Sequence, residues 1–275
     1  MKMLKEEMLD LLTAMIEILQ AEKGDSQSAE LELASLEEAF PIWRGLVNQR
    51  SAGPIGADYL AAEEAFLAAY HEENMQDVSV CQPTSAPQIF IYPGDLCHLQ
   101  VDAVVNAANS QMLGCFIPNH ACLDNALHTF AGLELRQFCA KKMEEQGLPA
   151  AVGKVMVTPG FHLPAGLVFH TVGPFISEGK PVSAIRRGLL EQCYLSCLEE
   201  AQARGLKAIA FPALSTGEFG YPKDQAAEVA VRTVRKWLAE TAYPLKVIFS
   251  TYTVEDQGYY TALLGEKEDV HVADA

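Results

Sequence analysis

The sequence predicts an α/β fold in which helices cover both faces of a largely parallel sheet, preceded by a small helical N-terminal extension. Two observations support this prediction. Residues 1–80 show only helical periodicity, whereas short β-branched runs alternate with helical runs from residue 89 onward. The chain has 275 residues, of which 49% are hydrophobic, and this suffices for one sizeable core and a short extension.

The N-terminal part contains three helical runs. Apolar residues recur at steps of three and four over residues 3–21, a shorter run covers about 29–40, and a third covers about 58–73. Pro41 is expected to open a new segment after the second run. The polar, proline-bearing stretch that follows has the composition of a linker. We therefore divide the chain into a helical extension (1–80), a linker (81–88), an α/β domain (89–265) and an acid-rich mobile tail (266–275).

The alternating pattern within the α/β domain defines its expected elements. Strands are predicted at residues 89–92, 103–107, 154–158, 167–171, 207–211 and 246–250. Helices are predicted near residues 119–145, 184–204 and 223–240. In open sheets of this kind, ligands bind at the carboxyl ends of the strands, so the loops after the strands are where chemistry is expected.

Composition restricts the class of partner. The net charge of −16, from 36 acidic and 20 basic residues, repels a phosphate backbone, so nucleic acid is not expected as a partner. The chain shows neither a long apolar span nor a signal-peptide pattern, and a membrane is not expected either. Seven irregularly spaced cysteines do not form a disulfide framework, which favours a cytoplasmic protein.

The loop after residues 207–211 is rich in glycine. Gly217 and Gly220 allow the backbone to approach a ligand closely, and Pro222 is placed to start the next helix at its first position. Backbone N–H groups of such a loop and of the following helix can bind a diphosphate. An ordinary turn with two glycines remains the alternative.

The loop after residues 103–107 contains three metal-binding side chains within eight residues. Cys115, His120 and Cys122 suit zinc, and no fourth ligand of matching quality follows nearby. Three protein ligands with one open position are typical of catalytic zinc. The alternative is that both cysteines are small core residues and that the histidine is a surface or capping residue.

Taken together, these segments resemble the macrodomain family of ADP-ribose-binding proteins. The resemblance rests on Gly94-Asp95-Leu96, the run from Val101 to Asn109 and the loop from Phe211 to Pro222, and it covers about residues 88–265. The segment from Gly114 to Asn125 is similar to that of the zinc-dependent microbial subfamily, whose members also have a helical N-terminal extension. This resemblance implies a three-layer α/β/α sandwich with a mixed, largely parallel sheet.

The resemblance also implies roles for individual residues. Asp95 would accept a hydrogen bond from the adenine amino group beside the Leu96 N–H, although an aspartate after glycine is equally suited to cap a helix. Tyr252 would stack on adenine, with a core tyrosine as the alternative. The other ADP-ribose-binding positions follow from the same motifs: Asn106, Asn109, Cys122, Leu123, Asp124, Ser215, Thr216, Gly217, Glu218 and Phe219.

The implied activity is zinc-dependent removal of ADP-ribose from mono-ADP-ribosylated protein side chains. Cys115, His120 and Cys122 would hold the zinc ion, and Asn109, Asp124 and Glu218 would be catalytic, with neither carboxylate favoured as the base. The subfamily further suggests an ester linkage to aspartate or glutamate on a lipoyl-carrier protein similar to the glycine cleavage H protein.

Three alternatives remain at this stage. The protein could be an ADP-ribose reader without turnover, an O-acetyl-ADP-ribose deacetylase, or a scaffold whose helical extension binds a partner. The remaining histidines and cysteines are expected to be structural: Cys139, Cys193 and Cys197 as buried small residues, and His128 and His170 as hydrogen-bonded core residues.

Overall fold

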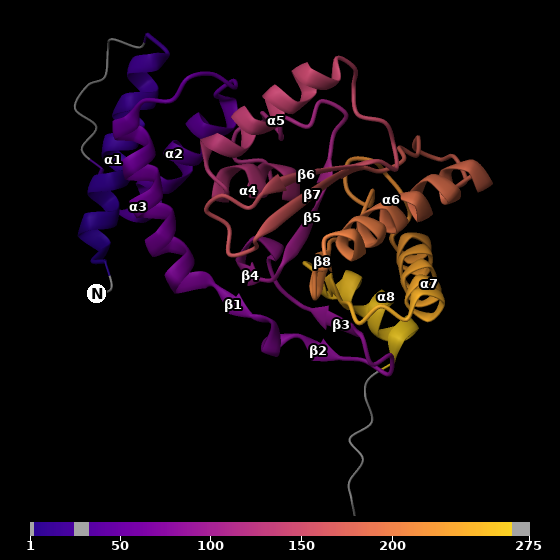
Figure 1. Cartoon of the computed structure of the whole chain (residues 1–275). Helices are drawn as coiled ribbons and strands as arrows, with labels where there is room; N and C mark the ends of the chain where they lie inside the picture. The colour runs from indigo at the N-terminus through magenta and orange to yellow at the C-terminus, as the bar shows by residue number, and fades with distance from the viewer. Residues whose placement is uncertain (1–2, 25–32, 266–275) are drawn as a thin grey trace, which may run out of the picture.

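The fold of the protein is given by a computed structural model, which describes residues 3–24 and 33–265 (Figure 1). Three helices come first: α1 (Lys5–Glu22), α2 (Leu36–Gln49) and α3 (Ala57–Asn74). They lie together on one side of the molecule, and we call them the N-terminal helical region. Helix α1 buries one apolar face, which is formed by Met8, Leu12, Met15, Ile16 and Leu19.

Helix α2 differs from the sequence prediction, which ended a helical run at residue 40. The helix begins after the cap Ser35, whose hydroxyl accepts a hydrogen bond from Glu38 N, and it continues through Pro41 to Gln49. Pro41 removes one backbone donor, but Ala39, Trp43 and Val47 are buried on the face of the same helix. Packing of this face therefore outweighs the helix-breaking tendency of proline. Residues 29–32 of the predicted run lie outside the described residues.

The central sheet has seven strands in the order β2-β3-β9-β8-β5-β7-β6. Its five inner strands are parallel, while β2 and β6 join the edges in antiparallel orientation. The strands are β2 (Gln82–Pro83), β3 (Ile89–Tyr92), β5 (Ala103–Ala108), β6 (Val155–Pro159), β7 (Leu167–Val172), β8 (Ala208–Phe211) and β9 (Lys246–Ser250). The predicted mixed, largely parallel sheet is confirmed.

Helices cover both faces of this sheet, which confirms the predicted sandwich (Figure 1). Successive strand residues point to opposite faces, so Val104 joins one core cluster and Val105 the other. The N-terminal helical region, α4 (Leu123–Phe130) and α5 (Leu133–Gln146) cover the first face. The second face is covered by α6 (Ala184–Ala203), α7 (Lys223–Thr241) and α8 (Val254–Leu264).

Aromatic side chains connect the N-terminal helical region to the sheet domain. Phe130 of α4 stacks on Tyr70 of α3 at 4.9 Å between ring centroids, and on Phe40 of α2 at 6.2 Å. Trp43 is fully buried in the same cluster and contacts Phe66 edge-on at 5.2 Å. The first core is thus shared between the two parts of the chain.

Several boundaries differ from the sequence predictions. The helix predicted over 119–145 is two helices, because Gly132 adopts φ 87° and turns the chain between them. Helix α8 was not predicted.

The segment expected as a linker contains β2, and just before it β1 (Gln76–Asp77) pairs with β4 (Leu99–Gln100). The predicted tail, 266–275, lies outside the described residues. Within residues 3–24 and 33–265, no helix has the length and apolar character needed to cross a bilayer.

Candidate active site

Residues from four parallel strands meet at one edge of the sheet. Asp95 follows β3, Asn109 follows β5, Ser215 follows β8 and Tyr252 follows β9. Because these strands are parallel, their carboxyl ends lie at the same edge, where open α/β sheets bind ligands. The loops identified from the sequence therefore surround one site.

The connection between β5 and α4 brings the three predicted metal ligands together. We call residues 113–125 the metal loop. The ligand atoms of Cys115, His120 and Cys122 all lie within 4.8 Å of one another, and Cys115 Sγ lies 3.5 Å from His120 Nδ1. Cys122 is also the N-cap of α4, where its sulfur accepts a hydrogen bond from Asn125 N (3.4 Å). All three side chains are half-buried, so the group is neither packed in the core nor fully in solvent.

This donor set fits a zinc ion. Tetrahedral zinc with ordinary bond lengths keeps its ligand atoms about 3.3–3.8 Å apart, and the Cys115–His120 separation already falls in that range. On the other side of the imidazole, His120 Nε2 lies 3.8 Å from Glu218 Oε1. A histidine that binds zinc through one nitrogen commonly directs the other to a carboxylate. Burial raises the pKa of the Cys122 thiol to about 12, so the thiolate form requires a nearby cation.

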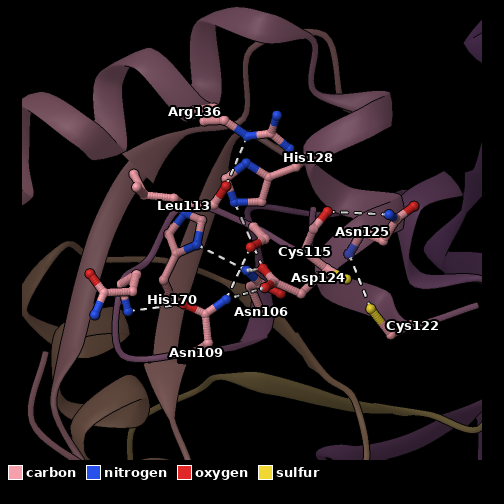
Figure 2. A network of polar contacts seen from close by, with 12 residues as sticks. Asn106, Asn109, Leu113, Cys115, Cys122, Asp124, Asn125, His128, Arg136 and His170 are labelled. Atoms are coloured by element: carbon pink, nitrogen blue, oxygen red, sulfur yellow. Dashed lines mark hydrogen bonds and ion pairs between the residues drawn. The ribbon is translucent and has the colours of Figure 1, made fainter. Parts of the chain in front are cut away.

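Asp124, near the end of the metal loop, forms an Asn–Asp–Asn arrangement with Asn106 and Asn109 (Figure 2). Asp124 accepts a hydrogen bond from Asn106 Nδ2 at Oδ1 (2.8 Å) and one from Asn109 Nδ2 at Oδ2 (3.2 Å). Asn109 Nδ2 also donates to Gly114 O (3.0 Å), which joins Asn109 to the metal loop. Burial raises the pKa of Asp124 to about 6, and the hydrogen bond from Asn106, the positive charge of Arg136 and the hydrogen bond from Asn109 oppose this rise.

His170 of the neighbouring strand β7 fixes the orientation of the Asn106 side chain. Asn106 Nδ2 lies 3.1 Å from His170 Nδ1, and because an amide nitrogen only donates, this ring nitrogen accepts. The proton is therefore on Nε2, which donates to Thr158 Oγ1 (3.1 Å). Burial lowers the pKa of His170 to about 3, consistent with the neutral ring. The prediction of a hydrogen-bonded core histidine is confirmed for His170.

For His128 the predicted burial is confirmed, but the predicted hydrogen bond is wrong. Its ring is buried beneath Gly114, and neither ring nitrogen has a hydrogen-bond partner among the described residues. Its Nε2 lies 3.7 Å from Asp124 Oδ1, beyond hydrogen-bond distance. Burial shifts the pKa of His128 well below its usual value, so the ring is neutral. Cys139 lies close to His128 and His170, but both nitrogens of His170 already have partners, so packing rather than metal binding explains this group.

The loop from residue 212 to residue 222, which we call the glycine loop, is held in an unusual conformation. Ser215 adopts φ 67°, and its hydroxyl is buried without a hydrogen-bond partner in the part of the chain that the structure describes. Thr216 Oγ1 donates to Ala213 O (2.9 Å), and Tyr221 N donates to Ser215 O (3.0 Å). Pro222 is the N-cap of α7 rather than its first residue. Strained backbone and unsatisfied buried hydroxyls are typical of ligand-binding loops.

The structure shows where the two residues that were predicted to bind adenine lie. Asp95 caps the short 3₁₀ helix Leu96–His98, because its carboxylate accepts a hydrogen bond from Cys97 N (2.9 Å). The capping alternative is thus observed. Tyr252 is 79% exposed, which rules out the alternative of a core tyrosine and leaves its ring free to stack. Phe219 of the glycine loop contacts Phe175 edge-on at 6.2 Å between ring centroids.

Two residues that the sequence analysis passed over support the site. Arg136 is buried and donates to Leu113 O (2.8 Å) at the start of the metal loop (Figure 2). Asn125 is fully buried and donates through Nδ2 to the carbonyl groups of Cys115 (3.3 Å) and Ile117 (3.0 Å). The sequence gives no local signal for Arg136, because the helix around it is rich in charged and polar residues and its burial depends on contacts with distant segments.

Comparisons with known proteins agree with this geometry. Residues 105–230 match the family described as Macro domain. The protein-ADP-ribose hydrolase of Staphylococcus aureus (strain MRSA252) is 42% identical over 249 residues, which cover 90% of this chain and 93% of that protein. The protein of the same name from Treponema medium is 39% identical over 232 residues, covering 83% of this chain and 88% of that protein.

Solved structures show the same fold. The Oceanobacillus iheyensis macrodomain with ADP is 32% identical, with a TM-score of 0.59, and the match covers 66% of this chain and 92% of that chain. The Trypanosoma brucei macrodomain in complex with ADP-ribose is 28% identical, with a TM-score of 0.61, over 80% of this chain and 94% of that chain. By fold, by the position of its site and by relatives that match over nearly their full length, the chain belongs to the macrodomain family.

Proposed function

We propose that this protein hydrolyses ADP-ribose from mono-ADP-ribosylated protein side chains and uses a zinc ion to do so. Its relatives from Staphylococcus aureus and Treponema medium are named protein-ADP-ribose hydrolase. The observation that supports zinc is the grouping of Cys115, His120 and Cys122 within 4.8 Å, next to Asn109. We further propose an ester linkage to aspartate or glutamate, and a lipoyl-carrier protein as substrate, from the subfamily resemblance.

The glycine loop would bind the diphosphate. Its backbone is already bent at Ser215 and at Gly220, which has φ 65°, so the N–H groups that would bind the phosphates would need little rearrangement. On the adenine side, Asp95 and the exposed Tyr252 would recognise the base. Together these contacts would position the ribose that bears the protein at the metal loop.

The Asn–Asp–Asn arrangement would hold that ribose. Asp124 accepts from both amide groups and thereby fixes Asn106 and Asn109 in one orientation. Asn106 Oδ1 is buried without a partner among the described residues, and this leaves an acceptor for a ligand hydroxyl. A bound zinc ion supplies Lewis acidity and lowers the pKa of a coordinated water molecule. Glu218 is 80% exposed and faces His120, so its first role would be to orient that imidazole.

Release of ADP-ribose from a carboxyl-linked mono-ADP-ribosylated protein tests this function. The wild type is expected to bind about one zinc ion and to release ADP-ribose, whereas Cys115→Ser and His120→Ala variants should lose both properties. A folded variant without zinc that retains full turnover would exclude the metal mechanism. If ADP-ribose binds, as measured by calorimetry, but none is released by the zinc-loaded wild type, the protein is a reader.

A further inference from the structure

The sheet domain contains the predicted zinc ligands, but the N-terminal helical region holds the loop that bears them. Arg44 of α2 donates through Nη2 to His120 O (3.2 Å). The residue before His120 is held as well, because Asn119 N donates to Asn48 Oδ1 (2.9 Å). The backbone of His120 is therefore fixed from both directions by side chains that are more than 70 residues away in the sequence.

The contact of α2 with the metal loop extends to both cysteines through Asn125. Arg44 donates to Asn125 Oδ1 from Nε (3.2 Å) and from Nη2 (2.8 Å), which fixes this side chain in a forked geometry. Asn125 Nδ2 donates to Cys115 O (3.3 Å), and Asn125 N donates to Cys122 Sγ (3.4 Å) (Figure 2). Arg44 thus fixes the Asn125 side chain that holds the Cys115 carbonyl, and the backbone N–H of the same residue contacts the Cys122 thiol.

The geometry of the metal loop shows why such support is needed. Asn119 adopts φ 54°, a left-handed conformation that costs free energy for a residue other than glycine. Its side chain donates to Pro41 O (3.0 Å), so α2 holds this strained residue at both its backbone and its side chain. Gly45 allows the close approach, because a Cβ atom at that position would lie 3.2 Å from Asn119 Nδ2.

The structure assigns Arg44 and Asn48 as positioning residues that hold Cys115, His120 and Cys122 in zinc-binding geometry. This inference rests on the proposed function, since it concerns the same metal. Arg44 forms no ion pair among residues 3–24 and 33–265, and its guanidinium contacts a backbone carbonyl and a neutral amide instead. Its role in the structure is therefore to set the loop geometry rather than to balance a carboxylate.

Zinc affinity and cobalt spectroscopy of the full chain test this assignment. Arg44→Ala and Asn48→Ala should weaken zinc binding, measured by chelator competition, by about 10- to 100-fold, as loss of outer-shell partners does in other zinc sites. They should also alter the ligand-field bands of the cobalt(II)-substituted protein, which a loss of global stability alone would not change. Arg44→Lys keeps the charge without the fork and should recover only part of the affinity.

Gln49→Ala is the matched control, because Gln49 lies next to Asn48 on α2 but is exposed, and within the described residues its side chain hydrogen-bonds only to Lys23. Its zinc affinity and cobalt spectrum should match the wild type. If Asn48→Ala does not fold, the half-buried Arg44→Ala decides the question. Wild-type affinity and spectrum in a folded Arg44→Ala variant would overturn this inference alone, whereas a wild type that binds no zinc would overturn the proposed metal site as well.

Discussion

At the residue scale, Ser215 and Gly173 determine the shape of the glycine loop. Ser215 adopts φ 67°, and a Cβ atom at Gly173 would lie 1.9 Å from its hydroxyl oxygen. No side chain at residue 173 is compatible with this position of Ser215. The glycine after β7 is therefore required by the conformation of a loop that follows β8, more than 35 residues later.

A Gly173→Ala variant should lose affinity for ADP-ribose, because the added methyl group displaces Ser215 and so disturbs the glycine loop that we propose to bind the diphosphate. Strain of about 1–3 kcal/mol corresponds to a dissociation constant that is roughly 5- to 150-fold larger, measured by calorimetry on the folded protein. Gly188→Ala is the control: Gly188 lies in α6, where an added Cβ atom meets nothing within 4 Å. Undiminished affinity in Gly173→Ala would show that Ser215 does not shape the proposed diphosphate site.

Asp124 is the second residue whose replacement gives a clear expectation. Its two carboxylate oxygens accept from Asn106 and Asn109, so an Asp124→Asn variant would place an amide NH₂ opposite one of these donors. We expect loss of turnover and a decrease of about 1–3 kcal/mol in the free energy of unfolding, measured by denaturant titration. A variant with wild-type turnover would show that neither asparagine needs this carboxylate.

Individual residues were predictable from the sequence where the interaction is local. Cys115, His120 and Cys122 lie within eight residues, and their proximity followed from spacing alone. The pairing of His120 with Glu218 and the contacts of Arg44 with the metal loop join distant segments, so no local pattern could show them. His128 was misjudged because burial is readable from an apolar run, whereas the absence of a partner depends on the tertiary structure.

At the element scale, a buried carboxylate joins α3 to α5. Leu133 N at the start of α5 donates to both oxygens of Glu63 (3.2 and 3.0 Å), and Tyr59 OH donates to Oε1 (3.1 Å). A carboxylate at a helix N-terminus stabilises the exposed N–H groups there. Gly132 leaves space for the Glu63 carboxylate, since a Cβ atom added at residue 132 would lie 2.8 Å from Glu63 Oε2.

Glu63 should make stability depend on pH. Burial raises the pKa of Glu63 to about 7, against lowering by hydrogen bonds from Leu133 and Tyr59. Because the pKa of Glu63 is higher in the folded state, the folded state binds more protons than the unfolded state. The contribution of Glu63 to the free energy of unfolding is therefore complete below pH ~4.5 and is lost as the pH rises to ~7. A Glu63→Gln variant should lack this decline, on the order of 3 kcal/mol in the free energy of unfolding between those pH values. Parallel pH profiles for the two proteins would show that Glu63 is ionised throughout.

The elements themselves were predicted well where one face is continuously apolar. The strands 89–92 and 246–250 have the predicted bounds, because buried parallel strands give uninterrupted β-branched runs. Helix α8 was missed because only Asp256, Tyr260 and Leu264 are buried, which gives too weak a period to recognise. Pro41 was misjudged because tertiary packing outweighs its helix-breaking tendency, and Gly132 was misjudged because the apolar period continues across a glycine that breaks the helix.

At the scale of the whole molecule, the division into an extension and a domain does not correspond to two separate cores. The sequence placed a boundary near residues 81–88, where composition changes. In the structure, Trp43 and Phe66 of the N-terminal helical region share one apolar cluster with Val104 and Val168 of the sheet. Composition reports only where the pattern of elements changes, whereas the extent of a core depends on contacts between distant segments.

A shared core predicts that the chain unfolds as one cooperative unit. The two tryptophans report on different parts, because Trp43 lies in α2 within the first core and Trp237 lies in α7 within the second. In a Trp237→Phe variant, the fluorescence of Trp43 and the far-ultraviolet circular dichroism should therefore give the same denaturant midpoint. The same coincidence is expected for Trp237 fluorescence in a Trp43→Phe variant, so each comparison is made within one protein.

If Trp43 fluorescence changed at a clearly lower denaturant concentration, α1–α3 would unfold before the sheet. The metal loop, which α2 holds through Arg44 and Asn48, would then lose its support while the rest of the site remained folded.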